Sequence, residues 1–324
     1  RPAALESFLE PHDKTVIIDE VQRVPHLLNE VHRQIENSSR KFILTGSSAR
    51  KLKHGQANLL AGRAWTAHLF PMSWSELPDF QLKRYLQFGG LPSVCLGDEP
   101  HEDLKSYVDT YLKEEIQAEG LVRKIPDFHR FLRVAALCSG QMLNFEKIAQ
   151  DSQTKPSTVR SYFEILEDTL IGFQLAPWEH GKKRRVIRTS KFYLFDSGVV
   201  HTLAGIKTLD PKSDLWGRAF EQFIANELRA FLAYGRYSEE LHYWRSAHGL
   251  EVDFIIGDSV AIEVKSTERP NSEDLKGLRA IADEGPWKRR ILICQSPRIQ
   301  RIEGIEVLPW SRFLDELWNG DFLK

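Results

Sequence analysis

The chain has 324 residues, of which 42% are hydrophobic and 27% charged, and its formal net charge is −1. This length and balance are typical of a globular protein of two or three domains, and they exclude a uniformly basic nucleic-acid coat while leaving room for a local basic patch. No apolar run reaches the roughly 20 residues of a membrane-spanning helix and no signal peptide is seen, so a cytoplasmic protein without a membrane partner is expected.

The first predicted strand is a β-branched run that ends in Asp19 and Glu20. It resembles a Walker B strand, in which the aspartate holds Mg²⁺ through water and the glutamate polarises the water that attacks a γ-phosphate. A helix from about Pro25 to Glu36 and a buried strand from Lys41 to Thr45 follow. This order of strand, helix and strand predicts a parallel sheet, with Thr45 in the place of a sensor residue near the phosphate.

The three cysteines, Cys95, Cys138 and Cys294, are far apart and lack CxxC spacing. This spacing implies neither a zinc site nor a disulfide framework. We expect three buried, reduced thiols.

The middle of the chain has a helix-turn-helix pattern. Residues 144–150 predict a short helix, residues 151–155 a turn, and residues 156–166 a second helix with proline near its start. Two strands are expected to follow, at about 170–178 and 185–195, which gives a winged arrangement.

Six basic residues of this winged region are candidates for contact with nucleic acid. They are Lys155 and Arg160 on the second helix and Lys182, Lys183, Arg184 and Arg185 in the loop between the strands. Contacts from such residues to phosphates would bind DNA in a strongly salt-dependent way. The alternatives are a protein-docking module and an ordinary solvated run of charge.

A longer helix is predicted over residues 216–232, where apolar residues recur at helical spacing and one face is therefore buried. Glu221 lies at the edge of that face. It is either a site carboxylate or an ordinary flanking residue, and Glu227 is a rival for the same role.

Residues 249–265 predict a β-hairpin. If residues 257–259 form a three-residue loop, Phe254 lies opposite Ile262 and Val252 opposite Val264, because residues that face each other on paired strands share a side of the sheet. That register gives one wholly apolar face. A two-residue loop would mix charge into the core, so the matching of apolar residues favours three.

The other face of this hairpin then collects Glu251, Asp253, Glu263 and Lys265. Two carboxylates beside an ammonium suit Mg²⁺ or Mn²⁺, and the lysine could orient or deprotonate an attacking water. The alternative is a half-exposed strand pair whose outer face is only solvated. Downstream, a buried strand at 291–294 and an amphipathic helix at 310–318 complete an α/β domain.

A helix with a glutamate, an aspartate at a strand end, and Glu-x-Lys on the next strand together resemble the PD-(D/E)XK nuclease superfamily. The resemblance implies that Asp253 and Glu263 bind the metal, that Glu221 assists and that Lys265 serves the attacking water.

A second resemblance covers nearly the whole chain. The segments at 17–25, 42–48, 60–63 and 69–77, followed by those at 88–92, 107–111 and 189–198, are similar to prokaryotic AAA-type ATPases that carry a C-terminal domain of unknown function, number 4143. The resemblance implies that Asp19, Glu20 and Thr45 are nucleotide-site residues. It makes Arg63 either a phosphate-sensing arginine or a partner in a structural ion pair.

One motif of that family is missing, because no G-x-x-x-x-G-K-[ST] loop is present in this sequence. Without the backbone N–H cradle and the lysine of that loop, the chain is not expected to hydrolyse ATP. We expect a truncated fragment or a product that has lost its first strand and phosphate loop, and ATP is a cofactor of the intact family only.

These features predict an α/β protein with four parts: a remnant of a parallel-sheet P-loop ATPase domain (1–78), a helical lid (79–135), a winged helix-turn-helix (136–205) and a nuclease-like domain (206–324). Two functions stay open. One is metal-dependent cleavage of DNA with Mg²⁺ or Mn²⁺, and the other is a non-catalytic, ATP-switched scaffold that binds DNA or a protein partner. The oligomeric state is left open.

Overall fold

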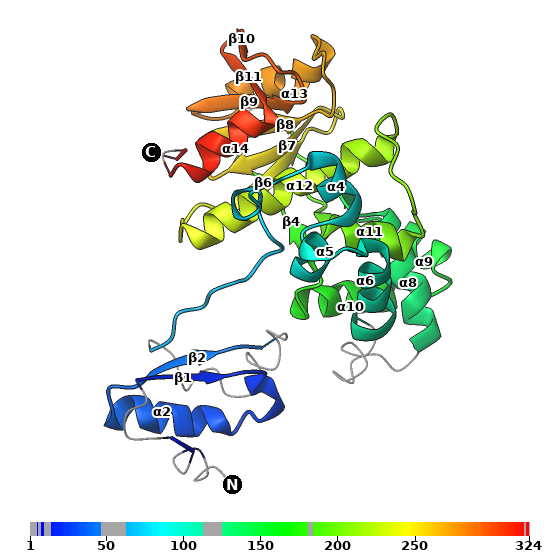
Figure 1. Cartoon of the computed structure of the whole chain (residues 1–324). Helices are drawn as coiled ribbons and strands as arrows, with labels where there is room; N and C mark the ends of the chain where they lie inside the picture. Colours follow the sequence, from blue (N-terminus) through cyan, green and yellow to red (C-terminus); the bar gives the residue numbers. More distant parts are fainter. Residues whose placement is uncertain are drawn as a thin grey trace. The chain divides into compact units, whose positions relative to one another are not determined.

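The computed structural model describes residues 5, 8–9, 14–46, 63–112, 125–180, 184–320 and 322–323 (Figure 1). It divides into two compact units, one formed by residues 1–66 with 163–171 and the other by residues 67–162 with 172–324. Among the described helices, none is both long and apolar enough to cross a membrane.

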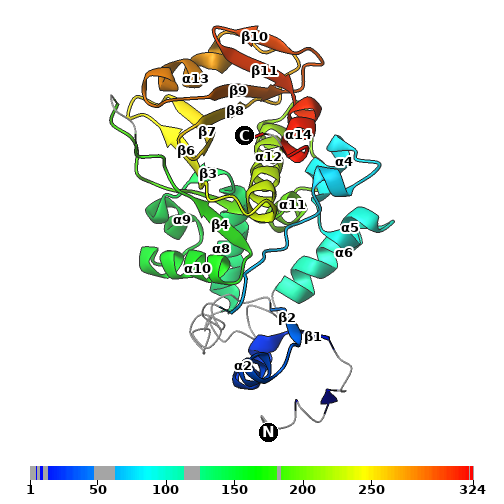
Figure 2. The same ribbon diagram turned by 90° about the vertical axis from the view of Figure 1, so that its left-hand side faces the viewer.

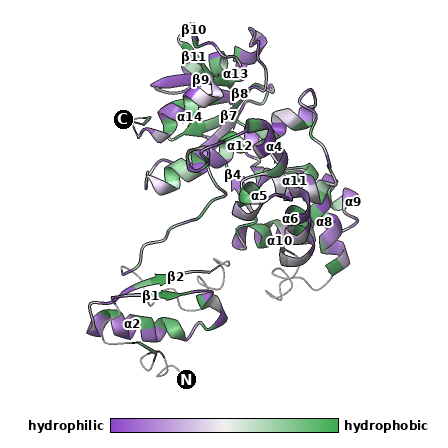
Figure 3. Cartoon of the chain, viewed as in Figure 1, coloured by the Kyte–Doolittle hydropathy of each residue, from purple (hydrophilic) through white to green (hydrophobic). Residues whose placement is uncertain are grey.

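The first unit contains a two-stranded parallel sheet, as predicted. Strand β1 (Thr15–Ile18) pairs with β2 (Lys41–Leu44), and η1 (Val21–Arg23) and α2 (Leu27–Asn37) connect them. Burial alternates along both strands, so one face of the pair is better covered than the other. Helix α2 lies along the strands and carries both hydrophobic and hydrophilic residues (Figure 3).

The second unit begins with a helical region. Its elements are η3 (Trp74–Glu76), α4 (Leu82–Phe88), α5 (Pro92–Leu96), α6 (Pro100–Ser106), a π-helical turn η4 (Tyr107–Leu112), α8 (Ile125–Leu137) and α11 (Ser197–Ala204). The buried Asp196 caps α11 by accepting a hydrogen bond from Val199 N and also accepts one from Gly90 N (2.7 Å). This carboxylate therefore ties α11 to the turn that follows α4.

The elements of the predicted helix-turn-helix lie at the expected positions. Helix α9 (Phe145–Asp151) is capped by Asn144, and α10 (Pro156–Asp168) follows after a short turn. Strands β3 (Gln141–Met142), β5 (Lys191–Leu194) and β4 (Gly172–Leu175) form an antiparallel sheet in that order.

The segment between β4 and β5 runs along the edge of the C-terminal sheet. Backbone hydrogen bonds join Trp178 N to Tyr243 O (2.6 Å) and Ile187 N to Arg245 O (2.9 Å). The described residues on either side of the basic loop, which the sequence places in a wing, are thus attached to strand β6.

The C-terminal sheet has six strands in the order β10-β11-β9-β8-β7-β6. Its elements are β6 (Leu241–Arg245), β7 (Glu251–Ile256), β8 (Val260–Val264), η5 (Glu273–Leu275), α13 (Lys276–Ala280), η6 (Ile281–Asp283), β9 (Arg289–Cys294), β10 (Gln300–Ile302), β11 (Ile305–Pro309) and α14 (Trp310–Trp318). Strands β8, β9 and β11 are parallel, and the other pairings are antiparallel. The strand and helix predicted at 291–294 and 310–318 are confirmed.

Two hydrophobic clusters cover the two faces of this sheet. Helices α12 (Asp214–Tyr234) and α14 contribute to one cluster, together with Phe254 and Ile262, and α13 contributes to the other, together with Ile255 and Ala261. Figure 2 shows α12 and α13 on opposite sides of the strands. All three cysteines are free; Cys294 is buried, whereas Cys95 and Cys138 are only half-buried, which corrects that prediction.

Helix α12 is anchored by a cap at its N-terminus. Ser213 Oγ accepts a hydrogen bond from Trp216 N (3.3 Å) and donates one to Asp210 O (2.7 Å). Since an N-cap serine contributes about 1 kcal/mol, Ser213→Ala is expected to lower the free energy of unfolding by that amount. Urea unfolding checks this, and Ser213→Asp, which keeps an acceptor, should retain most of the stability.

Candidate functional site

The predicted three-residue loop and the pairing of Phe254 with Ile262 are confirmed, whereas Val252 and Val264 lie in different hydrophobic clusters. Phe254 pairs with Ile262 and Ile256 with Val260, so Gly257, Asp258 and Ser259 form the loop. Gly257 has φ +53°, a left-handed conformation that glycine adopts without strain. Asp258 accepts a hydrogen bond from Trp178 Nε1 (2.8 Å), which fixes the loop against the segment after β4.

The prediction of one polar face on the hairpin is wrong, because β7 carries an irregularity. Its register against β6 shifts between the pair His242–Ile255 and the pair Trp244–Val252, which leaves two β7 residues opposite Tyr243. Such a bulge re-aims the side chains beside it. Val252 accordingly packs in the cluster of α13, whereas Phe254 packs in the cluster of α12.

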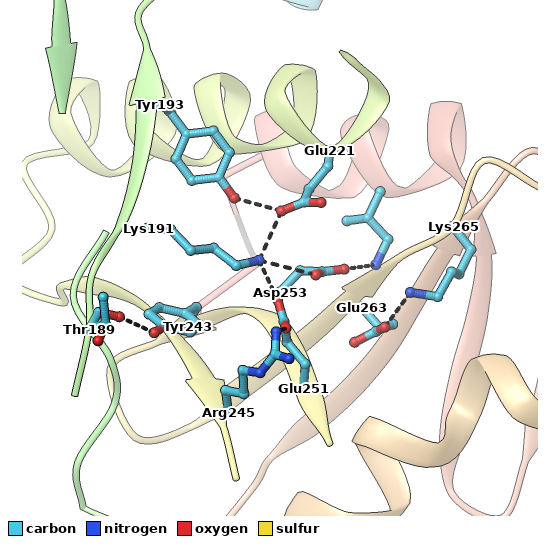
Figure 4. Close-up of polar contacts among 11 residues, drawn as sticks. Thr189, Lys191, Tyr193, Glu221, Tyr243, Arg245, Glu251, Asp253, Glu263 and Lys265 are labelled. Atoms are coloured by element: carbon cyan, nitrogen blue, oxygen red, sulfur yellow. Dashed lines mark hydrogen bonds and ion pairs between the residues drawn. The ribbon is translucent and has the colours of Figure 1, made fainter. Parts of the chain in front are cut away.

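The bulge directs two carboxylates of β7 toward a buried lysine of β5 (Figure 4). Lys191 Nζ lies 2.5 Å from Glu251 Oε1, 3.1 Å from Glu221 Oε1 and 3.6 Å from Asp253 Oδ1. The Lys191 side chain is only 4% exposed. We call Lys191, Glu221, Glu251 and Asp253 the lysine cluster.

Three other residues contact the lysine cluster. Tyr193 OH donates a hydrogen bond to Glu221 Oε1 (2.6 Å), and Arg245 Nη1 lies 2.7 Å from Glu251 Oε2. The Lys191 ammonium also lies 5.4 Å from the ring centroid of Tyr243. The structure thus joins the helical Glu221 to Asp253, as the nuclease resemblance implies, but through a lysine that the sequence analysis did not select.

The other two predicted residues, Glu263 and Lys265, form a pair beside the cluster. Lys265 Nζ lies 2.5 Å from Glu263 Oε1. The residue between them in sequence, Val264, donates a hydrogen bond from its backbone N to Asp253 Oδ2 (2.9 Å). Glu263 Oε2 is buried and has no hydrogen-bond partner among the described residues. Glu263 also lies against α13, because a Cβ added to Gly277 would be 3.3 Å from Glu263 Oε2.

Burial and mutual repulsion disturb the ionisation of these carboxylates. Burial, followed by the charge of Asp253, raises the pKa of Glu263 well above its usual range. Burial also raises the pKa of Glu221, although Lys191 opposes the shift. The pKa of Lys265 is raised, because the carboxylates of Asp253 and Glu263 outweigh the opposing effect of burial. A cation near Asp253 and Glu263 would relieve this repulsion.

These side chains fit a hard divalent cation with few protein ligands. Within the described part of the chain, no three His, Cys, Asp or Glu side chains are arranged to hold a metal ion. Mg²⁺, however, is usually bound by one or two carboxylates and keeps several waters. Asp253 and Glu263 supply two carboxylates, and the unpartnered Glu263 Oε2 is a buried oxygen of the type that such an ion binds.

Glu227, the rival of Glu221, lies elsewhere. Its two oxygens accept hydrogen bonds from Trp74 N and Trp318 Nε1, both at 2.7 Å. Burial, opposed by these hydrogen bonds, raises the pKa of Glu227 to about 7. Glu227 therefore ties η3 and α14 to α12, and Glu221 is the α12 carboxylate of the lysine cluster.

The residues of the predicted nucleotide site lie at the ends of β1 and β2. Thr45 Oγ1 donates a hydrogen bond to Asp19 Oδ1 and accepts one from Glu20 N (3.2 Å). Arg63 forms an ion pair with Glu36 (3.0 Å), which is the structural alternative given for it. The two strands thus bring Asp19, Glu20 and Thr45 together. Arg63 is paired with Glu36 instead.

The predicted basic residues have different surroundings. Lys155 and Arg160 are exposed, and the Arg160 guanidinium stacks 4.0 Å from the centroid of the Phe145 ring. Arg184 forms an ion pair with the buried Glu284 (2.7 Å), which makes it a structural residue. Arg185 is exposed, whereas Lys182 and Lys183 lie outside the described residues.

A groove of about 760 Å³ is lined in part by this basic segment. Its lining residues are Glu179, Arg184, Arg185, Val186, Ile187, Arg188 and Ala247. The Arg188 side chain is 82% exposed and lies 3.5 Å from Glu179. Arg185 and Arg188 are therefore the two arginines of the groove that are open to solvent.

Three family models match the chain in succession. Residues 2–78 match an AAA domain, residues 79–210 a domain of unknown function (DUF8612), and residues 216–313 another domain of unknown function (DUF4143). The chain carries an AAA domain at its N-terminus and DUF4143 at its C-terminus. The carboxylates of the site belong to the DUF4143 match, and Lys191 belongs to the DUF8612 match.

The chain is also similar to uncharacterised proteins of several organisms. One from Mycobacterium tuberculosis is 26% identical over 267 residues, which are 79% of this chain and 59% of the relative. One from Haemophilus influenzae is 24% identical over 90% of this chain and 75% of the relative, and one from Methanocaldococcus jannaschii is 24% identical over 75% and 58%. The chain thus spans 59% of the mycobacterial relative. No solved structure matches the chain.

Proposed function

We propose that the C-terminal domain is a divalent-metal-dependent phosphodiesterase of the nuclease type that cleaves DNA. Asp253 and Glu263 hold Mg²⁺ or Mn²⁺, Lys265 orients the attacking water, and Glu221 assists through the lysine cluster. The observation that carries the proposal is the buried, unpartnered Glu263 Oε2 beside Asp253 and the Lys265–Glu263 pair.

Each side chain has a proposed role that follows from its position. A bound divalent ion would polarise a phosphoryl oxygen and lower the pKa of a water. Lys265 is about one-third exposed, so its ammonium reaches solvent while it holds Glu263 Oε1. Asp253 accepts a hydrogen bond from Val264 N, which fixes its carboxylate against strand β8. Glu221, through Lys191, fixes the position of Asp253.

Cleavage of linear and single-stranded DNA in the presence of Mg²⁺ or Mn²⁺ tests the proposal. We expect Asp253→Ala and Lys265→Ala each to lower the cleavage rate at least about 100-fold, the lower end of what a lost acid–base group costs. Asp258→Asn is the matched control, since this aspartate lies in the loop of the same hairpin and is 57% exposed. Cleavage that persists equally in all variants would show a contaminating nuclease and reject the proposal.

A second function is favoured by a different observation. Lys191 already places a buried ammonium among three carboxylates, as in a nuclease fold that serves only as a scaffold. The AAA domain, with Asp19 and Thr45 in contact, would then make an ATP-switched protein that binds DNA or a protein partner in the intact family. Tight binding of DNA or protein without cleavage in either metal would favour this scaffold over the nuclease.

The basic groove gives a separate prediction about DNA. Arg185 and Arg188 are open to solvent along it, so each is expected to contact one phosphate. Arg185→Gln should reduce the slope of log K against log salt by about 1 and weaken binding of all sequences alike. Fluorescence anisotropy over a salt series measures this slope. Arg312→Gln, on α14 and outside the groove, is the control, and an unchanged slope for Arg185→Gln would contradict the prediction.

A further inference from the structure

The lysine cluster has the composition of a cation site that already holds its cation. An ammonium has three N–H donors, and Lys191 has three carboxylates within ion-pair distance: Glu221, Glu251 and Asp253. Its side chain is 4% exposed, so bulk water does not provide an alternative set of partners. The three carboxylates come from α12 and β7, and only the lysine comes from β5 (Figure 4).

Formal charges show what Lys191 balances. Three carboxylates surround Lys191, those of Glu221, Glu251 and Asp253, and among the described residues the one other cation that the structure pairs with them is Arg245. Without Lys191, this group of described residues would have a formal excess of two negative charges. That excess equals the charge of one divalent ion, and carboxylate oxygens are the ligands that Mg²⁺ and Mn²⁺ prefer.

We propose that Lys191 is a built-in cation that fills the pocket of Glu221, Glu251 and Asp253, so that divalent metal is confined to the neighbouring Asp253–Glu263 pair. Lys191 is thus a positioning residue that sets how many metal ions the site takes. This inference deepens the proposed nuclease function and rests on it for the metal at Asp253–Glu263. Since Lys191 lies in the region that matches DUF8612, that region completes the site of the DUF4143 domain.

The test is to count Mn²⁺ ions bound by the full chain and by its Lys191→Met variant, using electron paramagnetic resonance of free Mn²⁺ in a titration. Methionine keeps an unbranched apolar side chain, without the terminal ammonium, and so removes the charge. We expect the variant to bind about one more Mn²⁺ per chain than the unaltered protein, because the three carboxylates are released. Its melting temperature should fall in EDTA and recover in Mn²⁺, a dependence that a merely structural lysine would not show.

Two controls isolate the charge at this position. Lys191→Arg keeps a cation in the cluster and should leave the Mn²⁺ count unchanged. Lys212→Met removes the same charge from an exposed position and should also leave it unchanged.

The outcomes separate this inference from the proposed function. If the unaltered chain binds no Mn²⁺ and Lys191→Met binds one, the built-in cation stands and the proposed nuclease function fails. If both chains bind Mn²⁺ in equal number and with equal affinity, the built-in cation is rejected while the nuclease function stands. A Lys191→Met chain that stays unfolded in saturating Mn²⁺ also rejects it, because a vacated cation pocket should then be filled and the fold restored.

Discussion

Gly277→Ala is expected to destabilise the C-terminal domain by about 2 kcal/mol and to weaken metal-dependent activity at the same time. A Cβ at this position would lie 1.8 Å from Glu251 O and 3.3 Å from Glu263 Oε2. The first neighbour is backbone of β7, so α13 and the strand must move apart. Overpacking of this kind costs about 1–3 kcal/mol, and the better helix propensity of alanine returns about 1 kcal/mol at most.

The site should respond because both neighbours of Gly277 belong to it or adjoin it. Glu251 holds Lys191, and Glu263 carries the unpartnered oxygen proposed to bind metal. Moving α13 therefore displaces two of the four carboxylates. Urea unfolding and the Mn²⁺ affinity measure the two effects on one sample.

Gly217→Ala is the matched control for this substitution. Gly217 lies inside α12, and its nearest neighbour to an added Cβ is Ser266 Oγ at 3.3 Å, the end of a small side chain that can rotate. Alanine should stabilise the helix there by about 0.5–1 kcal/mol. Equal loss of stability in the two variants would show that the close approach of α13 to β7 is not what requires Gly277.

The features that the sequence predicts well are those set by local pattern. Matching apolar residues across a three-residue loop gives the pairing of Phe254 with Ile262, since a one-residue slip would bury charge. The strand predicted at 291–294, which the structure extends to 289–294, and the helix at 310–318 follow from an apolar run and from helical spacing. Helix α12 and its Glu221 follow from the same reasoning.

The site could not be predicted in full because its geometry depends on long-range contacts. The bulge of β7 arises in its pairing with β6, and no pattern within residues 251–256 indicates it. Lys191 is 62 positions from Asp253 in sequence, and it opens a strand whose other residues are all buried. The sequence feature that could have identified Lys191 is its position directly before the apolar run Phe192-Tyr193-Leu194, within a segment that carries the family resemblance.

Glu227→Gln is expected to remove a large part of the pH dependence of stability. The pKa of Glu227 is about 7 in the folded chain against an ordinary value of 4.5, chiefly because it is buried. The folded state therefore keeps a proton that the unfolded state releases, so the contribution of Glu227 to stability is fully present below about pH 4.5 and is lost as pH rises to 7. At 1.36 kcal/mol for each pH unit, the loss is about 3 kcal/mol.

Glutamine carries no charge at any pH, so the variant lacks this loss. It can accept only one of the two hydrogen bonds from Trp74 N and Trp318 Nε1, which costs about 1 kcal/mol or more. The variant should thus be less stable than the unaltered chain at pH 5 and equal or more stable at pH 8. Trp74 and Trp318 contact Glu227 directly, so unfolding followed by tryptophan fluorescence reports on this region.

The comparison of Glu227→Gln with the unaltered chain isolates Glu227, because the other buried acids are the same in both proteins. Burial raises the pKa of Asp196 to about 6, and it raises that of Glu221 as well, but these contributions cancel in the difference between variant and unaltered chain. Glu240→Gln, at a side chain that is 82% exposed, should leave the pH profile as it is. If the stability difference between Glu227→Gln and the unaltered chain is the same at pH 5 and pH 8, Glu227 is ionised in the folded protein throughout, and the hydrogen bonds from the two tryptophans outweigh its burial.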